Sequence, residues 1–576
     1  MNANRLLFAM ICVSALTLAG GGSGLHAQDL GKIGKAKPFT FSGSIGGGVN
    51  FYHSNETLTT RDPFTWNLYG SFMPTIYNFS LPFSFVVNQY SRSYTTPFAQ
   101  FGISPTYKWI KLHLGYRSIN FSPLTFAGQS FKGAGIELTP GIFRFAAFYG
   151  SLNKAISEDT TSGRLAMPQY GRIGYGARIG VGTEANHIDL IYFHAKDDSG
   201  SVRLINDTVI LRPQENTVIG TSFKLTLIKR IVWTADLAAS ALTQDLAAQK
   251  VVKDTLTKSI DKLFSSLIDY RNSTRVSLSG QSQLTLLLRS FNTTIGYRRV
   301  QPDFKSLGVP YMLNDIEAWQ WNAGGVLSRG KVNLNANVTA QHNDISHNEE
   351  SELHNLTASF NMGAMLSPHA NLGLAATLVN LRQTDGTNHI SDSIRQDEQV
   401  YNFSITPSFS FGSMSVANSL GFGLNYSLLN DNNPVTSPST NSHTMTGTMN
   451  YTCSFLRQAS SLNGSLIYNR YAQDSSVYTS YGINAGAAAQ FLKDKTLGVQ
   501  VTVGYMFNHY TLGTVSNNVT GGLNAHYTVA KRHSFSAYFN IVSTPPSSSS
   551  TNLQQKVPYT VSTTNTAGGL SYNYSF

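Results

Sequence analysis

The stretch that decides the fold is the carboxyl-terminal segment Leu570–Phe576, which reads LSYNYSF. Its large apolar or aromatic side chains alternate with small polar ones, and the large ones are Leu570, Tyr572, Tyr574 and Phe576. Successive side chains of a β-strand point to opposite faces, so the segment predicts a strand that is apolar on one side and polar on the other. Both soluble β-sandwiches and membrane-spanning β-barrels contain such strands. The rest of the chain distinguishes the two.

The amino terminus predicts export. Arg5 precedes an apolar run at residues 6–19, and small residues follow as far as Ala27. This order is typical of a secretory signal peptide, with cleavage after Ala27. The apolar run is shorter than the ~20 residues that a membrane-spanning helix needs. We therefore expect residues 1–27 to be removed and residues 28–37 to form a short leader before the first strand.

Composition narrows the class of protein. Charged residues make up only 13% of the chain, whereas about 25% is usual for globular domains. After residue 27 no apolar run approaches the length of a spanning helix, which excludes a polytopic helical membrane protein. Cys453 is the one cysteine beyond that point, so an intramolecular disulfide cannot form. The net charge is +11, but the basic residues recur at short turns instead of on one surface, so nucleic-acid binding is not expected.

Alternation of apolar and polar residues recurs along residues 38–576. In the segment 496–508, Val499, Val501 and Val503 lie on one side, and Gln500 and Thr502 lie on the other. In the segment 332–341, aliphatic residues alternate with Asn, Thr and Gln. Asn is depleted in strands of soluble proteins, but it suits a strand with lipid on one face and water on the other. The pattern therefore favours a barrel that encloses a water-filled lumen.

Connections between the expected strands alternate between short and long. The short turns are expected at Pro74-Thr75, Lys108-Trp109, Pro140-Gly141, Thr183–Asn186, Lys229-Arg230, Arg289-Ser290, Arg329-Gly330, Ser367–His369, Gly412-Ser413, Arg457–Ala459, Lys493–Lys495 and Ala530–Arg532. Between these turns lie longer polar connections, so the chain predicts about 26 strands (24–26). An even number places both termini beside the short turns, which in outer-membrane barrels face the periplasm.

In its signal peptide, its alternating strands and its terminal Tyr572–Phe576 pattern, the chain resembles the large outer-membrane β-barrel proteins of Gram-negative bacteria. The resemblance is architectural and covers residues 38–576. It implies an all-β fold: a single transmembrane antiparallel up-and-down β-barrel in the outer membrane, with a periplasmic leader, short periplasmic turns and long external loops. It further implies that Leu570, Tyr572, Tyr574 and Phe576 form an assembly signal for the barrel assembly machinery, and that outer-membrane lipids surround the protein.

One external loop, at residues 245–269, differs from the others because its apolar residues recur at helical spacing. These residues are Leu256, Ile260, Leu263, Phe264 and Leu267. The spacing predicts an amphipathic helix. A helix that caps the barrel rim is the favoured interpretation. A constriction folded into the mouth is the functional alternative, and the sequence leaves both open.

No other pattern indicates catalysis or a cofactor. The loop at residues 341–354 is rich in His, Asp and Glu but lacks the spacing of any zinc motif, so a solvated loop is favoured, and binding of a cation stays open. The chain has no nucleophile elbow, no paired-carboxylate pattern and no phosphate-binding glycine loop. We therefore expect neither enzymatic activity nor a cofactor.

Two functions remain. The first is a porin-like transport conduit for solutes or a partner polymer, gated or plugged by loops or by a partner. Barrels of 16–18 strands already leave an aqueous channel, so about 26 strands would leave a wide one. The alternative is a sealed barrel that serves as an adhesion or assembly platform for surface proteins, with a periplasmic or lipoprotein partner.

Overall fold

The computed structural model describes most of the chain. The described residues are 39–55, 61–76, 79–89, 100–157, 168–202, 211–252, 256–474, 476–511, 514–544, 548–549 and 562–576. The expected signal peptide and leader lie outside these ranges. Strands dominate the fold, and the helices are short.

The first half of the sheet contains the following strands: β1 (Phe39–Ser54), β2 (Phe64–Ile76), β3 (Phe79–Ser80), β4 (Phe83–Asn88), β5 (Gln100–Ile103), β6 (Thr106–Tyr107), β7 (Ile110–Ser118), β8 (Ser130–Leu138), β9 (Phe143–Asn153), β10 (Gly171–Gly182), β11 (His187–Asp198), β12 (Glu215–Leu227), β13 (Ile231–Thr243), β14 (Thr274–Leu287) and β15 (Phe291–Val300). The helix α2 (Ser259–Phe264) lies between β13 and β14.

The second half continues with β16 (Ile316–Leu327), β17 (Val332–Asn343), β18 (Ser351–Ser367), β19 (Ala370–Asp385), β20 (Asp397–Gly412), β21 (Val416–Asp431), β22 (Ser442–Phe455), β23 (Ser460–Gln473), β24 (Ser476–Phe491), β25 (Leu497–Tyr510), β26 (Thr514–Val529), β27 (His533–Thr544), β28 (Ser548–Ser549) and β29 (Thr563–Ser575). The short helices are α3 (Ser437–Thr440), η4 (Ser328–Gly330) and η5 (Lys493–Lys495).

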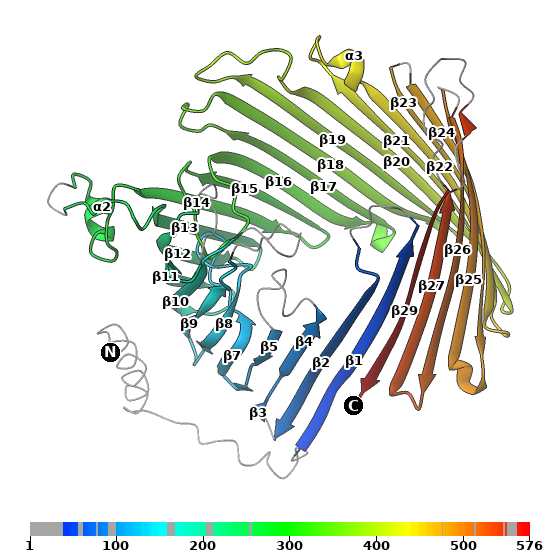
Figure 1. Cartoon of the computed structure of the whole chain (residues 1–576), viewed down its shortest axis with the longest axis horizontal. Coiled ribbons are helices and arrows are strands. Elements are labelled where there is room, and N and C mark those ends of the chain that lie inside the picture. Colours follow the sequence, from blue (N-terminus) through cyan, green and yellow to red (C-terminus); the bar gives the residue numbers. More distant parts are fainter. Residues whose placement is uncertain are drawn as a thin grey trace.

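The sheet closes on itself. Consecutive strands pair antiparallel, and the last strand, β29, pairs with both β27 and β1. At the seam Val49 lies opposite Leu570, and β29 runs between β27 and β1 in Figure 1. Strands β3 and β4 together form one interrupted wall strand, and β5 and β6 form another. Strand β28 is a two-residue segment that pairs only with β26. The barrel therefore has 26 wall strands. The predicted barrel class and strand number are confirmed.

Most of the predicted turns are confirmed, with one correction. Pro74 lies within β2, paired with Phe41, and β2 continues to Ile76, so the first turn follows Ile76 instead of Pro74. A strand can continue through proline at a position where no neighbouring carbonyl requires its missing N–H. At the other end, the β23–β24 connection spans only two residues, so the alternation of short and long connections is not strict. We call the two ends the short-turn end and the long-loop end.

The outer face of the barrel is apolar. Side chains of directly paired residues lie on the same face of the sheet. The strand register therefore places the apolar side chains of successive strands on the outer face, all around the barrel. Trp66, Trp233, Trp319 and Trp321 all lie exposed on this face. Val501 belongs to the same face, whereas Thr502 points into the lumen, as predicted. Within the described ranges, no helix is long and apolar enough to cross a membrane.

Candidate functional site in the lumen

Two loops at the long-loop end fold back against the inner wall. They are loop 119–129, between β7 and β8, and loop 301–315, between β15 and β16. Their apolar side chains join inward-facing residues of β8–β16 in one buried cluster: Ile119, Phe121, Leu124, Phe126, Phe131, Ala146, Phe148, Leu152, Ile191, Phe193, Ala195, Val218, Ala238, Leu242, Val300, Phe304, Leu307 and Ile316. Where the loops dock, these strands are therefore apolar on both faces. We call the two loops the inward loops.

Phe126 lies at the centre of this cluster. Its ring centroid is 4.2 Å from that of Phe148 and 5.4 Å from that of Phe193, and its side chain has no exposed surface. Burying one such side chain contributes about 1.5–3 kcal/mol. Gly308 permits the close approach of the two loops, because a Cβ there would lie 2.7 Å from Phe126 Cδ2 and 2.7 Å from the Thr125 carbonyl oxygen.

Buried polar groups fix loop 301–315 to the wall. The Asn216 side-chain amide donates to the Lys305 carbonyl oxygen at 3.2 Å, and the Leu307 N–H donates to Asn216 Oδ1 at 3.0 Å. Ser240 Oγ donates to the same Lys305 carbonyl at 2.6 Å. Asn216 is fully buried and Ser240 nearly so. Because buried polar groups are costly to leave unpaired, these bonds fix one position of the loop.

The wall beneath the inward loops carries a row of ion pairs near the short-turn end. Arg144 pairs with Asp189 through two bonds, with Nε–Oδ1 at 2.9 Å and Nη2–Oδ2 at 3.1 Å. Arg178 approaches the other side of the same carboxylate at 3.8 Å. Lys111 and His113 both contact Glu137 Oε1, at 3.1 and 2.7 Å. Each carboxylate is therefore shared by two bases.

Nearer the long-loop end, Arg172 and Asp197 form another pair, with Nε–Oδ1 at 2.7 Å. Lys305 of the inward loop lies close to them. Burial lowers the pKa of the Lys305 ammonium and nearby Arg172 lowers it further, whereas Asp197 raises it. The loop therefore adds a cation to a wall that already holds an arginine.

Basic side chains outnumber acidic ones on this wall. The inward-facing basic residues of β7–β16 are Lys111, Arg117, Arg144, Arg172, Arg178, Lys224, Arg275 and Arg298. The inward-facing acidic residues of the same strands are Glu137, Asp189, Asp197 and Asp236. The side chain of Arg298 pairs with no other described residue, and its Nε is buried. Its neighbour Arg299 faces outward and pairs with Glu317 at 2.9 Å. The lumen on this side is therefore net positive.

The opposite wall, β17–β29, is polar but nearly uncharged. Its inward-facing residues include Asn335, Asn402, Asn425, Asn484 and Thr502. Acidic and basic residues in these strands occur only within four positions of the long-loop end. The lumen thus has one wall that is charged and covered by loops, and another that is neutral and hydrophilic.

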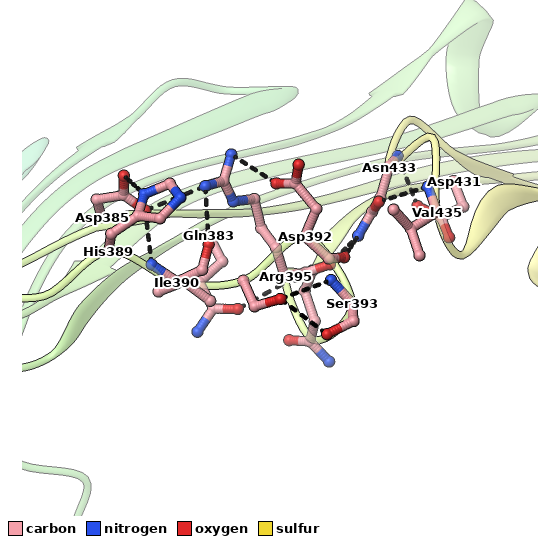
Figure 2. A network of polar contacts seen from close by, with 12 residues as sticks. Gln383, Asp385, His389, Ile390, Asp392, Ser393, Arg395, Asp431, Asn433 and Val435 are labelled. Atoms are coloured by element: carbon pink, nitrogen blue, oxygen red, sulfur yellow. Dashed lines mark hydrogen bonds and ion pairs between the residues drawn. The ribbon is translucent and has the colours of Figure 1, made fainter.

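A polar network orders the long-loop end above β19–β22 (Figure 2). Asp385 accepts from His389 at 2.8 Å and from Arg395 at 3.1 Å. The Asn433 side-chain amide donates to the carbonyl oxygens of Asp392 and Arg395, at 2.5 and 2.8 Å. These bonds join the loops that follow β19 and β21 and give this surface a defined shape.

The helical loop packs on the outer face of the wall, so the structure gives no support to the mouth constriction predicted for Leu256, Ile260, Leu263, Phe264 and Leu267. Helix α2 is only six residues long, and its Phe264 packs with Ile268 against Ala241 of β13. Ala241 faces outward, because its neighbours Ser240 and Leu242 face the inward loops. The helix therefore covers the outer face of β12–β14 at the long-loop end, and Figure 1 places it outside the wall.

The loop at residues 341–354 is held by backbone capping. Asp315 accepts from the Asp344 and Ile345 N–H groups at 3.1 and 3.0 Å, and Asp344 Oδ1 accepts from those of Asn348 and Glu349 at 2.8 and 3.0 Å. Asp344 is almost fully buried. Among the described residues, no group of three or more His, Cys, Asp or Glu side chains is arranged to hold a metal ion.

Comparison with known proteins gives architectural likeness only. No family model and no curated protein match the chain. Similar solved structures include the translocation pore of the P pilus usher PapC, at 10% identity and a TM-score of 0.36, covering 93% of this chain and 99% of that one. They also include the FrpB iron transporter of Neisseria meningitidis, at 12% identity and a TM-score of 0.31, covering 96% and 83%. OccAB2 of Acinetobacter baumannii has 9% identity and a TM-score of 0.30, covering 63% and 92%.

The closed sheet and the apolar outer face define the class of protein. Among the described residues each wall strand pairs with a neighbour on both sides, so the sheet forms its backbone hydrogen bonds within the barrel. The protein is a transmembrane β-barrel of the kind found in bacterial outer membranes.

Proposed function

We propose that the barrel is a transport conduit for small hydrophilic solutes, narrowed by the inward loops. The observation that carries this proposal is the docking of loops 119–129 and 301–315 on one inner wall while the opposite wall stays polar. An apolar cluster inside a lumen restricts the aqueous path without closing the polar side. With the short turns in the periplasm, the inward loops enter from the external side.

We further propose that the conduit favours anions. Eight basic and four acidic side chains face the lumen from β7–β16, and Arg298 has no partner among the described residues. Fixed charge of one sign raises the local concentration of ions of the opposite sign in a narrow aqueous path. Phosphate, carboxylate or sulfate groups would suit such a wall, since arginine binds them with fixed geometry.

Planar bilayers test both steps. Purified full-length protein should give a steady conductance, and under a potassium chloride gradient its reversal potential should indicate chloride preference. Arg298→Gln should weaken that preference. Arg299→Gln is the matched control and should leave it unchanged, because Arg299 faces outward beside Glu317. Cation preference in the wild type would refute the anion step.

A sealed platform for adhesion or assembly is the second candidate. The ordered surface built by Asp385, Arg395 and Asn433 favours it, since a surface that binds another protein benefits from a defined shape. Folded protein that remains electrically silent in bilayers would support the platform and overturn the conduit.

A further inference from the structure

The segment around α2 presents a second, outward apolar surface next to the lipid-facing wall. Leu263 is 54% exposed and Leu267 is 41% exposed, although Phe264 between them is fully buried. No described element covers these two leucines. Their position on the outside of the barrel separates them from the lumen.

Helical geometry divides this segment into three sides. At about 100° per residue, Ile260, Phe264 and Ile268 share the side that meets the wall. Leu263 falls on one flank of that side, as does Leu267 in the hydrogen-bonded turn that follows α2, whereas Lys262 falls nearly opposite the wall and Lys258 is the N-cap residue. Both lysines are exposed. The exposed surface of the segment is therefore amphipathic, with the leucines on one side and the lysines on another.

The leucine flank continues the apolar outer face of the barrel. Phe264 packs against Ala241 and Val276, which are paired neighbours on β13 and β14. Two positions further along β14, Leu278 is 48% exposed on the same face. Two strand residues span only about 7 Å, so α2 lies at the upper edge of the lipid-facing surface.

Internal bonds hold the segment in this place. Lys250 pairs with Asp269 at 2.8 Å, which lowers the pKa of the Asp269 carboxyl. Burial, with the nearby Asp261 carboxylate, raises the pKa of Tyr270 to about 12. The Val251 N–H donates to the Tyr270 carbonyl oxygen at 2.9 Å. The two ends of the loop are thus joined, and α2 is held against the wall.

We propose that this segment is a lipid-binding element in which Leu263 and Leu267 enter the acyl-chain region of the outer leaflet while Lys258 and Lys262 contact headgroup phosphates. Leucines on one side and lysines on another are the arrangement of helices that lie in a membrane interface. Continuity with Leu278 and the rest of the lipid-facing surface favours a lipid over a protein at this site. The inference does not depend on whether the barrel conducts.

Spin labels at single cysteines test the placement. In a Cys453→Ser background, full-length protein labelled at position 263 or 262 is placed in vesicles of phosphatidylcholine and phosphatidylglycerol. At 263, collisions with oxygen should exceed those with a water-soluble nickel chelate several-fold, as at the lipid-facing reference position 501. At 262, on the side of α2 that faces away from the wall, the order should reverse. Equal chelate access at both positions, or protection of 263 from both reagents, would overturn the proposal.

The lysine contacts need a second measurement. Replacing both Lys258 and Lys262 by Glu should reduce oxygen collisions at 263 in anionic vesicles, because carboxylates are repelled by headgroup phosphates. In vesicles of phosphatidylcholine alone the same double variant should have little effect. An unchanged signal in the anionic vesicles would remove headgroup binding by the lysines from the proposal.

Discussion

Truncating Phe126 should release the inward loops without opening the barrel wall. Phe126 is fully buried between Phe148 and Phe193, and it belongs to a loop instead of a wall strand. Phe→Ala substitutions in protein cores cost about 3–5 kcal/mol. Each 1.4 kcal/mol is tenfold in an equilibrium constant, so the ratio of docked to undocked loop should fall by roughly 10² to 10³ or more.

Single-channel recording measures this change directly. Phe126→Ala should raise the mean conductance or add a flickering, larger open level. Phe539→Ala is the matched control: Phe539 lies on the outer face of β27 and is 48% exposed, so its loss should leave the current unchanged. If Phe126→Ala protein keeps its heat-modifiable migration, and hence its barrel, yet conducts as the wild type does, the inward loops do not limit the current and the reasoning fails.

Two further predictions concern the membrane wall and its assembly. Val501→Arg should cost about 2–4 kcal/mol of folding free energy in lipid vesicles, because it places a charge on the lipid face near the bilayer midplane. Thr502→Arg points into the lumen and should cost little. Equal costs of the two variants in denaturant titrations would argue against the assigned faces. Deleting Phe576 should lower the amount of folded barrel in membranes. The Phe576 ring packs against that of Phe41 beside the β1–β29 seam, with centroids 4.8 Å apart. A normal yield of heat-modifiable protein would count against a role in assembly.

The wall could be predicted from the sequence because its physics is local. Alternation such as that of Val501 and Thr502 sets the face of each residue, and the even strand count follows from the spacing of turns. The turn predicted at Pro74 was misplaced because proline occurs both in turns and at strand positions where its missing N–H is tolerated. The terminal Leu570–Phe576 strand indicated the fold and proved to be the closing strand.

The inward loops were missed although the sequence carries a sign of them. Alternation breaks down at residues 145–149 and 190–193, where apolar side chains point to both faces. Strands buried on both faces read as continuous apolar runs. Phe121, Leu124 and Phe126 also make loop 119–129 too apolar for a solvated loop. What covers an apolar inner wall depends on long-range contacts such as that of Phe126 with Phe193, which no local pattern specifies.

The helix at α2 was predicted from its periodicity, but the sequence left open whether it caps the rim or folds into the mouth. The spacing of Ile260 and Phe264 correctly indicated one buried side, and Ile268 completes it. Periodicity defines which side of a helix is apolar, but it does not say whether the inner or the outer face of the wall receives it. That choice follows from Ala241, a small residue whose outward direction depends on the register of β13.

Separation of the wall from the loops explains how one chain can combine a stable barrel with loops docked on its inner wall. Closure rests on backbone pairing between the wall strands, ending in the β1–β29 seam. The loops rest instead on the apolar cluster around Phe126 and on the bonds of Asn216 with loop 301–315. Ion pairs such as Arg144–Asp189 lie on the covered side, whereas the open side carries uncharged Asn and Thr. Changes to the loops should therefore alter the path through the lumen while the wall remains closed.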